Sequence, residues 1–482
     1  MMKLHLLSGM ALGLAFAAPA LAAPDLRSVI TNPGNATDLF PATTPGANTN
    51  RLGGFFSDLY FDRLTGAYLG LPDRGPGGGT IAYDTRVQEF SVGVNSATGT
   101  ISNLQLTRTT PLTTGAQAFN GLNPTLLNGS PAVLGRSLDP EGFAVGRNGN
   151  FYVADEYGPS VLEFTPSGSL VRSFAPPANL VPRQADTTLN FVDGRPTITT
   201  GRQDNRGYEG VTVSPDGSKL YAVLQAPLVN EGASNEGRRS RNVRIVEYDT
   251  ATGQAGRQLI YQLDDIAALN ALVPGNTFAA TAQGRNIGIS AIVALNANEF
   301  LILERDNRGV GVDDPTGAIP VASKRIYRID ISGATDVSGI SLAGVNALPT
   351  GVVPVSKALF LDIAAALRVA GLAIPEKLEG LTIGPRLDDG SYALLLGTDN
   401  DFSVTQNSSG VQFDVCTDGV AFSQVALDSA CPSGQALIPT FLYSFQADIP
   451  GFVEQTRVPE PASLLLLGVG LAAAGAMRRR HA

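Results

Sequence analysis

The residues of this chain that could do chemistry are carboxylates placed at the start of a repeated pattern. Glu141, Glu209 and Glu379 each precede a glycine and a short run of alternating apolar residues. Several carboxylates brought within a few ångströms repel one another unless a cation balances their charge. Hard oxygen ligands without imidazole favour Ca²⁺ over zinc. The pattern therefore predicts one or more Ca²⁺ ions bound by carboxylates.

The scarcity of histidine restricts the chemistry further. The 482 residues include two histidines, His5 and His481, and both lie in terminal segments that we assign below to targeting. Ser-His-Asp and Cys-His nucleophile systems and histidine zinc sites need an imidazole, so they are excluded from the exported body. Catalysis would have to use carboxylates, hydroxyls, lysine, arginine, tyrosine or an oxygen-bound metal.

Strand hairpins must position these carboxylates. The run after Glu141 passes through a Gly-containing turn into residues 151–155, and the same arrangement recurs after Glu209 and Glu379, with looser copies at Asp58 and Ser290. A further strand pair follows each hairpin, and four antiparallel strands per repeat are typical of a propeller blade. We predict an all-β propeller of five to seven four-stranded blades, with six as the central number. A β-sandwich is the competing architecture.

The spacing of the copies, about 70 to 90 residues, exceeds that of a bare blade of about 45 residues. Long insertions must therefore lie between strands, or a divergent blade is hidden among them. One insertion, residues 356–373, has apolar residues near a helical spacing and predicts a short helix.

In an antiparallel hairpin, the start of the first strand and the end of the second lie at one edge of the sheet. Polar residues occupy both points of the repeats. If the first strands line a channel, these side chains form an acidic ring at one mouth. The predicted metal ligands are Glu141, Asp155, Glu209, Glu304, Glu379 and Asp399. The alternative is that the repeated Glu-Gly satisfies backbone amides and the glycine serves the turn.

Arginines cluster near the same mouth. Arg206 precedes Glu209 and Arg305 follows Glu304. Guanidinium groups suit phosphate or carboxylate ligands, although pairing with neighbouring acids is their commoner role in an acidic protein. The predicted catalytic residues are Glu209, Arg206 and Arg305.

Net charge argues against nucleic acid as a partner. Without Lys3 and the three terminal arginines, the chain has 30 basic against 43 acidic residues, a net charge of −13. Binding to a phosphate backbone needs a basic surface. A divalent cation, or a small anionic or ester substrate that a cation bridges, suits this charge better.

Both ends of the chain are typical of export. Lys3, the apolar run 6–18 and the small residues before position 24 indicate a signal peptide over 1–23. At the other end, Val458-Pro459-Glu460-Pro461 precedes the apolar stretch 462–477 and three arginines. This order resembles the PEP-CTERM sorting signal, here 458–482, which implies an exosortase-type processing enzyme and a membrane segment with its arginines on the cytoplasmic side. Buried terminal helices are the alternative at each end.

Cys416 and Cys431 are the only cysteines. In an oxidising compartment they could form one structural disulfide that closes a short loop, worth on the order of 3 kcal/mol. Two free buried cysteines are the alternative.

The Glu-Gly hairpins together with Asp155-Glu156-Tyr157-Gly158, Glu304-Arg305-Asp306 and Gly397-Thr398-Asp399-Asn400-Asp401 resemble the phytase-like domain family, also described as esterase-like activity of phytase. The resemblance covers about residues 50–447, with 24–49 as a leader segment and 448–457 as a linker. It implies a propeller fold and a possible calcium-dependent hydrolase of phosphoesters or esters. A non-catalytic, calcium-stiffened propeller that binds at the cell surface or in the matrix is the alternative, and a lactonase-like metal hydrolase is another.

Overall fold

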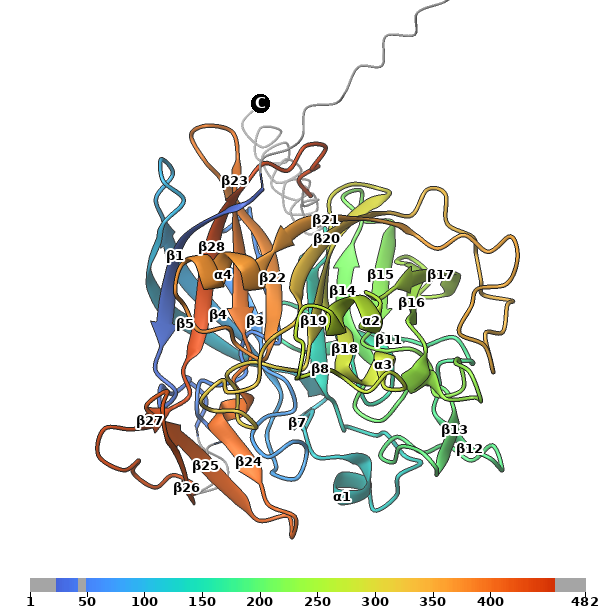
Figure 1. Ribbon diagram of the computed structural model, residues 1–482, viewed down its shortest axis with the longest axis horizontal. Helices are drawn as coiled ribbons and strands as arrows, with labels where there is room; N and C mark the ends of the chain where they lie inside the picture. Colours follow the sequence, from blue (N-terminus) through green and yellow to red (C-terminus); the bar gives the residue numbers. More distant parts are fainter. Residues whose placement is uncertain (1–22, 42–48, 456–482) are drawn as a thin grey trace, which may run out of the picture.

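Five four-stranded antiparallel sheets follow one another along the described part of the chain (Figure 1). The computed structural model describes residues 23–41 and 49–455. From the inner to the outer strand, the first sheet has β2 (Asp58–Phe61), β3 (Tyr68–Leu71), β4 (Arg86–Val94) and β5 (Ile101–Pro111). The second has β8 (Pro140–Val145), β9 (Phe151–Asp155), β10 (Val161–Phe164) and β11 (Leu170–Phe174). The third has β14 (Tyr208–Val213), β15 (Lys219–Leu224), β16 (Asn242–Asp249) and β17 (Ala255–Gln262).

The last two sheets complete the set. The fourth has β18 (Ile287–Ala294), β19 (Glu299–Asp306), β20 (Lys324–Asp330) and β21 (Ser356–Asp362). The fifth has β22 (Leu378–Arg386), β23 (Tyr392–Thr398), β28 (Thr440–Ala447) and β1 (Asp25–Asn32). Because β1 pairs antiparallel with β28, the first and last strands of the described chain share one sheet.

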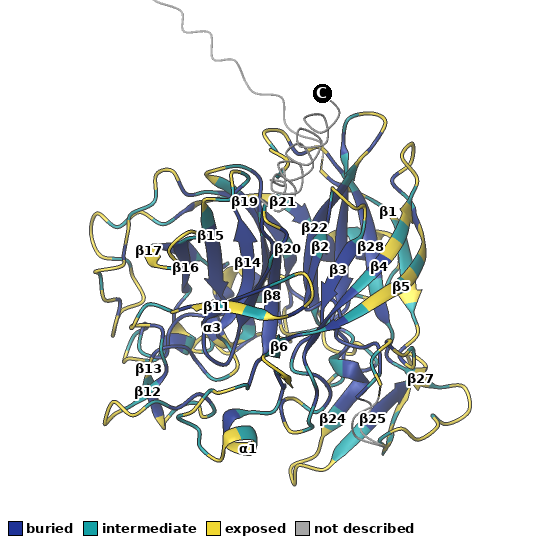
Figure 2. Cartoon of the chain, turned by 180° about the vertical axis from the view of Figure 1, so that it is seen from behind, coloured by how far each residue is buried: buried dark blue, intermediate teal, exposed yellow. Residues whose placement is uncertain are grey.

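The inner strands close a ring. Contacts run from β2 to β8, β14, β18 and β22, and from β22 back to β2. The hydrophobic clusters lie between neighbouring sheets, so each sheet buries both of its faces. In Figure 2 the inner strands β8 and β14 are buried, while exposed residues lie in the connecting loops and along the outer strands β5 and β11.

Shorter elements lie in the connections. They are β6 (Thr113–Thr114), β7 (Gln117–Ala118), α1 (Pro124–Asn128), β12 (Arg183–Gln184), β13 (Ile198–Thr200), η1 (Gly237–Arg239), α2 (Ile266–Asn270), α3 (Gln283–Asn286), α4 (Ile363–Val369) and η2 (Asp401–Ser403). A separate small sheet between β23 and β28 has β24 (Val404–Gln406), β25 (Gln412–Thr417), β26 (Phe422–Ala426) and β27 (Ala436–Leu437). A disulfide joins Cys416 and Cys431 within it.

The five hairpins predicted from the repeats are confirmed as β2/β3, β8/β9, β14/β15, β18/β19 and β22/β23. The described part of the chain has five sheets in the ring, one fewer than the central prediction of six. The wide spacing of the repeats comes from loop insertions and from the β24–β27 sheet, not from a sixth sheet in the ring. The expected helix over 356–373 covers only Ile363–Val369. Residues 356–362 instead pair with β20 as the fourth strand of their sheet, and this pairing outweighs their local helical spacing.

The segments expected to flank the domain also contact it. Within 24–49, the strand β1 belongs to the fifth sheet rather than to a separate leader. Within 448–457, the Val453 amide donates to the Leu295 carbonyl at 2.7 Å, and Phe452 packs beside Tyr392. In residues 23–41 and 49–455, no helix is long and apolar enough to cross a membrane. The predicted signal peptide up to residue 22 and the apolar stretch 462–477 lie outside the described residues.

The glycine of the Glu-Gly repeat lets the inner strands approach one another. A Cβ at Gly142 would lie 2.7 Å from the Gly210 Cα, and one at Gly210 would lie 3.0 Å from the Ile292 amide nitrogen. A Cβ at Gly380 would lie 3.0 Å from the Phe56 carbonyl oxygen. Because backbone atoms cannot rotate away as a side chain can, these positions require glycine.

Substitution of Gly142 by alanine should therefore destabilise the fold. We expect Gly142→Ala to lower the free energy of unfolding by about 1–3 kcal/mol, the usual range for overpacking. Gly333→Ala is the matched control, since no atom lies within 4 Å of the Cβ it would add. Urea unfolding of the two variants and the parent protein measures the difference, and equal stability of both variants would contradict the close-approach argument.

Candidate active site at the acidic end of the ring

The repeated carboxylates occupy bulges at one end of the inner strands. The strand register breaks between Pro140 and Gly142, between Tyr208 and Gly210, between Ile289 and Ala291, and between Leu378 and Gly380. The residues left at these breaks are Glu141, Glu209, Ser290 and Glu379. A bulge turns the extra residue out of the normal alternation of a strand. Four of the five inner strands therefore present their motif residue at the same end of the ring.

Three of these residues are carboxylates in one electrostatic environment. Burial raises the pKa of Glu141, and the charges of Glu209 and Glu379 raise it further. Burial and the charge of Glu379 likewise raise the pKa of Glu209 to about 8. The structure thus brings Glu141, Glu209 and Glu379 together, as a shared site requires.

A tighter group of carboxylates surrounds Glu141. Oxygens of Asp139, Glu141 and Glu156 lie within 4.8 Å of one another. Glu156 is 1% exposed, and neither of its carboxylate oxygens has a hydrogen-bond partner. Burial, followed by the charges of Glu209 and Asp139, raises the pKa of Glu156. A buried carboxylate without partners is costly as an anion, so this position calls for a proton or a cation.

Arg206 and Gln225 hold the carboxylate of Glu209. The Gln225 side-chain amide donates to Glu209 Oε1, and Arg206 donates to the Gln225 side-chain oxygen. Arg206 also donates to the Arg285 carbonyl at 3.1 Å. Burial, followed by the charge of Arg285, lowers the pKa of Arg206 to about 10. The glutamine at the end of β15, where the other repeats have an acid, is therefore the link between Arg206 and Glu209.

Arg305 fills the place of the glutamate that the fourth repeat lacks. Its Nε donates to the Ser290 hydroxyl at 2.8 Å, and its Nη2 bonds to Glu379 Oε1. The short serine side chain leaves room for the guanidinium beside the axis. The fourth sheet therefore contributes a positive charge to a ring to which its neighbours contribute negative ones.

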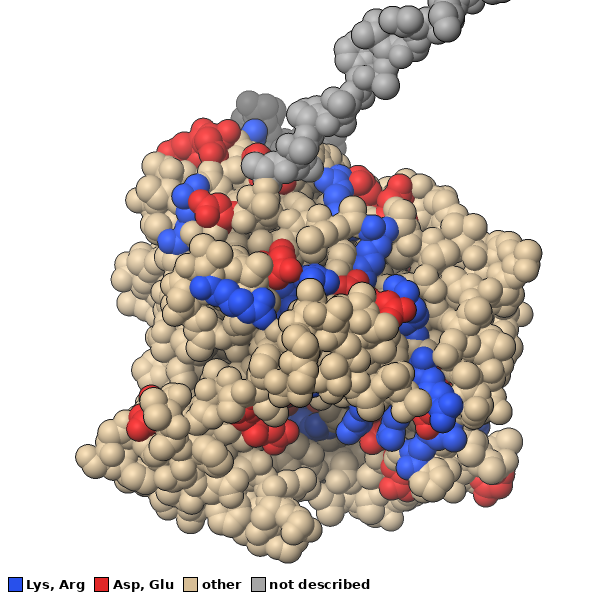
Figure 3. Space-filling view, in the orientation of Figure 1, with Lys and Arg blue, Asp and Glu red and all other residues tan. Residues whose placement is uncertain are grey.

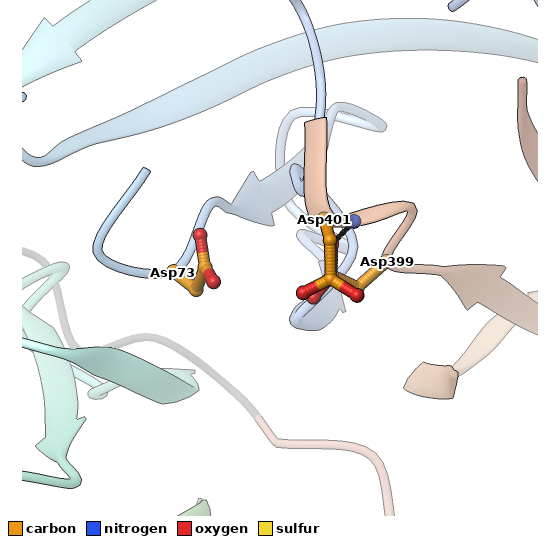
Figure 4. Close-up of side chains that lie close together, drawn as sticks. All are labelled: Asp73, Asp399 and Asp401. Carbon is orange, nitrogen blue, oxygen red and sulfur yellow. Dashed lines mark hydrogen bonds between the residues drawn. The ribbon is translucent and has the colours of Figure 1, made fainter. Parts of the chain in front are cut away.

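A second acidic group lies on the fifth sheet's side of the ring. Figure 4 shows Asp73 facing Asp399 and Asp401, whose oxygens lie within 4.8 Å of one another. Lys377 Nζ donates to Asp399 Oδ2 at 2.9 Å and also to Asp401. Lys377 supplies one positive charge against these three carboxylates, and burial followed by the charge of Asp399 raises the pKa of Asp73.

The backbone next to this group is strained. Asp401, Phe402 and Ser403 are consecutive residues with φ of 48°, 56° and 57°, in the left-handed region that side chains disfavour. The Asn400 side-chain oxygen accepts from the Phe402 amide at 3.1 Å, and Arg51 donates to the Phe402 carbonyl at 2.8 Å. Such strain costs about 1–3 kcal/mol per residue and persists where surrounding contacts fix it, commonly at functional sites.

Two predicted ligands serve other networks. The Glu304 carboxylate accepts from the Tyr261 hydroxyl at 2.6 Å, the Asp264 amide at 2.8 Å and Lys357 at 2.7 Å. These three hydrogen bonds hold both of its oxygens within this network. The Asp155 carboxylate accepts from the backbone amides of Asp139, Tyr157 and Gly158 and fixes the loop after β9. We therefore leave both residues out of the proposed metal site, and Asp155 holds Glu156 in place instead.

Sequence reasoning did not include Asp139 or Glu156 among the ligands. Glu156 directly follows Asp155, so either residue of this pair could have faced the axis. Asp139 directly precedes β8 and the bulge at Glu141, so strand alternation gave no signal for it. It pairs with Arg74, whose Nη1 lies 2.7 Å from Asp139 Oδ2.

In Figure 3, basic and acidic side chains lie side by side in the hollowed lower part of the face shown. This is the end where the loop insertions gather in Figure 1.

The protein is a closed ring of β-sheets with buried, charge-paired carboxylates at one end. The Phytase-like family, described as "Esterase-like activity of phytase", matches residues 50–402, and the chain belongs to this family. The PEP-CTERM protein-sorting motif matches residues 457–480. The chain is 28% identical over 392 residues to an uncharacterized secreted protein of Arthroderma benhamiae, covering 69% of this chain and 74% of the relative. The protein is thus an exported member of the family, associated with the cell envelope.

Solved structures resemble the chain only distantly. Virginiamycin B lyase from Staphylococcus aureus is 10% identical with a TM-score of 0.30, covering 85% of this chain and 84% of the lyase. A luciferin-regenerating enzyme is 11% identical with a TM-score of 0.29, covering 84% of this chain and 96% of the enzyme. At these scores the likeness carries no functional argument.

The raised pKa values predict a pH-dependent stability. The folded state retains a proton on Glu209 up to a pKa of about 8, whereas the unfolded chain loses it near the ordinary value of 4.5. The stabilisation linked to this proton is complete below about pH 4.5 and is lost as the pH rises towards 8. In chelator, we therefore expect the melting temperature to fall between pH 5 and pH 8. Glu209→Gln, which carries no titrating proton there, should show a shallower decline in scanning calorimetry.

Burial also raises the pKa values of Glu141 and Glu156, so a metal bound by these carboxylates must compete with their protons. Added Ca²⁺ should consequently raise the melting temperature more at pH 8 than at pH 5. A melting temperature that rises with pH in chelator would contradict the assignment of these carboxyls as protonated in the metal-free protein.

Proposed function

We propose that the acidic end of the ring is the active site of an exported, calcium-dependent hydrolase of phosphoesters or carboxylic esters. The observation that carries this proposal is the buried Glu156 carboxylate, which has no hydrogen-bond partner and lies beside Asp139 and Glu141. A cation would stabilise a carboxylate in this position, and without one its burial as an anion would lower the free energy of unfolding. The scaffold is a propeller of five blades, in agreement with the closed ring of inner strands.

The donor set suits Ca²⁺. Asp139, Glu141 and Glu156 offer only hard oxygen ligands, and Ca²⁺ takes six to eight of these. Three carboxylates fill part of such a shell, which leaves positions for water and for substrate oxygens. A bound Ca²⁺ would neutralise charge on the substrate and polarise the bond to be cleaved.

Glu209 is the proton donor in this proposal. A pKa of about 8 keeps its carboxyl protonated near neutral pH, and Glu209 Oε2 is buried without a partner. During hydrolysis a water oxygen bonds to the phosphorus or acyl carbon as the bond to the leaving oxygen breaks. The leaving oxygen takes the proton of Glu209, and a carboxylate of the cluster takes one from the water.

The arginines have different tasks. Arg206 has a buried Nε without a partner and therefore spare capacity to donate to charge that develops on the substrate. Arg305 is already bonded to Ser290 and Glu379. It positions Glu379 and sets the electrostatic potential of the site.

A non-catalytic role has one observation in its favour. Asp139, Glu379 and Asp399 are each paired with a basic residue of the chain, namely Arg74, Arg305 and Lys377. These pairs would stiffen a surface that binds a ligand without turnover. A measurement of substrate turnover distinguishes the two functions. Processing of the 458–482 signal by an exosortase-type enzyme is expected with either function.

Calcium binding and turnover should depend on Glu156. We expect the purified protein to hydrolyse p-nitrophenyl phosphate, a p-nitrophenyl ester or phytate with Ca²⁺ and not with chelator. Glu156→Gln should weaken Ca²⁺ binding at least tenfold in titration calorimetry, because it removes one charged ligand. Glu89→Gln is the matched control on the outer part of the first sheet, where Glu89 pairs with Arg108. Calcium binding without turnover of any substrate would favour the non-catalytic role, and unchanged binding by Glu156→Gln would refute the site.

Arg206 should act on turnover more than on metal binding. Arg206→Gln removes a guanidinium whose hydrogen bonds, within the described residues, go to Gln225 and the Arg285 carbonyl. We expect kcat/KM to fall by about 10²-fold, the lower end of the range for loss of one charge-stabilising donor. Calcium affinity should stay within about threefold of the parent value. A loss of calcium binding equal to that of Glu156→Gln would show that Arg206 supports the fold of the site rather than the reaction.

A further inference from the structure

The opposite end of the ring contains a cavity. A pocket of about 650 Å³ is lined by all five inner strands, from the residues that follow the glycine constriction up to the hairpin turns. The acidic residues lie before the glycines and the pocket lies after them, so the two sites open at opposite ends of the inner strands. Its volume is within the roughly 300–1,000 Å³ of small-molecule sites.

The wall of this pocket is apolar over most of its depth. Leu59, Phe143, Val211, Ile292 and Leu381, one from each inner strand, form a layer directly beyond the constriction. A second layer nearer the mouth has Phe61, Val145, Val213 and Ile383. An apolar cavity of this size that opens to solvent at a polar rim marks a ligand site.

Asp58 closes the floor. Its carboxylate accepts from the Leu59 and Phe143 amides, each at 2.7 Å. Because Asp58 is bound to the backbone, it belongs to the structure of the constriction between the pocket and the acidic cluster. The apolar layers above it are therefore the part that is open to a ligand.

Charge is concentrated at the mouth. Arg63 lies 5.0–5.7 Å from the ring centroids of Phe61, Tyr392 and Phe452. Its carboxylate partner is Glu454, at 3.5 Å and with 47% of its side chain exposed. Arg63 Nη2 also donates to the Ile383 carbonyl at 2.7 Å. A guanidinium held between aromatic rings, with a partly solvated counter-ion, suits the carboxylate of an incoming ligand.

We propose that this channel binds a single-chain carboxylate amphiphile, with its alkyl chain along the ring axis and its head group at Arg63. Alkyl groups match the two apolar layers, and the head group replaces or joins Glu454. The site is independent of the acidic end, and its ligand needs no calcium.

The test measures binding of dodecanoate to the full chain by titration calorimetry in the presence of chelator. Val293 lines the channel and is partly exposed, so Val293→Trp should fill the channel, and a melting curve of the variant checks that the adjoining core still folds. We expect this variant to bind dodecanoate at least tenfold more weakly than the parent. Val420→Trp is the matched control, since Val420 is 88% exposed on the β24–β27 sheet. Equal binding by both variants would overturn the proposal.

Two further measurements separate its parts. Dodecan-1-ol, which lacks the charge, should bind at least fivefold more weakly than dodecanoate, and equal affinities would overturn the role of Arg63. Glu156→Gln should leave dodecanoate affinity unchanged. A parallel loss of dodecanoate binding and calcium binding in Glu156→Gln would place the ligand at the acidic end and overturn the second site.

Discussion

The close approach of the inner strands is the constraint on which the rest of the structure depends. At Gly142, Gly210 and Gly380 the neighbouring backbone leaves no room for a Cβ. A ring packed this tightly excludes water from its centre, so the polar groups at either side of the constriction must find partners in the protein or in a ligand. The constriction also divides the ring axis into two compartments, one with carboxylates and one with apolar side chains.

Charge compensation determines what the acidic compartment can do. Lys377 pairs with both Asp399 and Asp401, Arg305 pairs with Glu379, and Arg74 pairs with Asp139. Both oxygens of Glu156, one oxygen of Glu209 and one of Glu379 are left without hydrogen-bond partners. Removal of a charge from water costs several kcal/mol when it is not compensated. The carboxyl oxygens without partners therefore mark the point where a proton or a metal enters, beside the paired ligand Asp139, and the other paired carboxyls form its rigid surroundings.

Much of this arrangement follows from the sequence, because a hairpin puts strand starts and strand ends at one edge. The alternation in 141–155, 209–224 and 379–396 was sufficient to place Glu141, Glu209 and Glu379 together. It could not show which member of Asp155-Glu156 faces the axis, because a bulge or a turn breaks the alternation there. It also could not show that Tyr261, Asp264 and Lys357 bind Glu304, since these contacts join residues about 40 to 50 positions apart. The number of sheets was obscured for a related reason: a loop insertion and a hidden blade give the same spacing.

The fourth repeat shows how an apparent defect in the pattern is compensated. Its Ser290 replaces a glutamate, and the sequence alone suggests an incomplete ring. In the fold, the space left by the short side chain is filled by Arg305 from the adjacent strand, which reaches Glu379 of the fifth sheet. A fourth glutamate at this point would add repulsion to Glu209 and Glu379, whose pKa values burial already raises. The positive charge of Arg305 thus lowers the free-energy cost of burying the neighbouring carboxylates. It also makes the ring asymmetric, because the carboxylates proposed to bind a metal lie on the side of the second sheet.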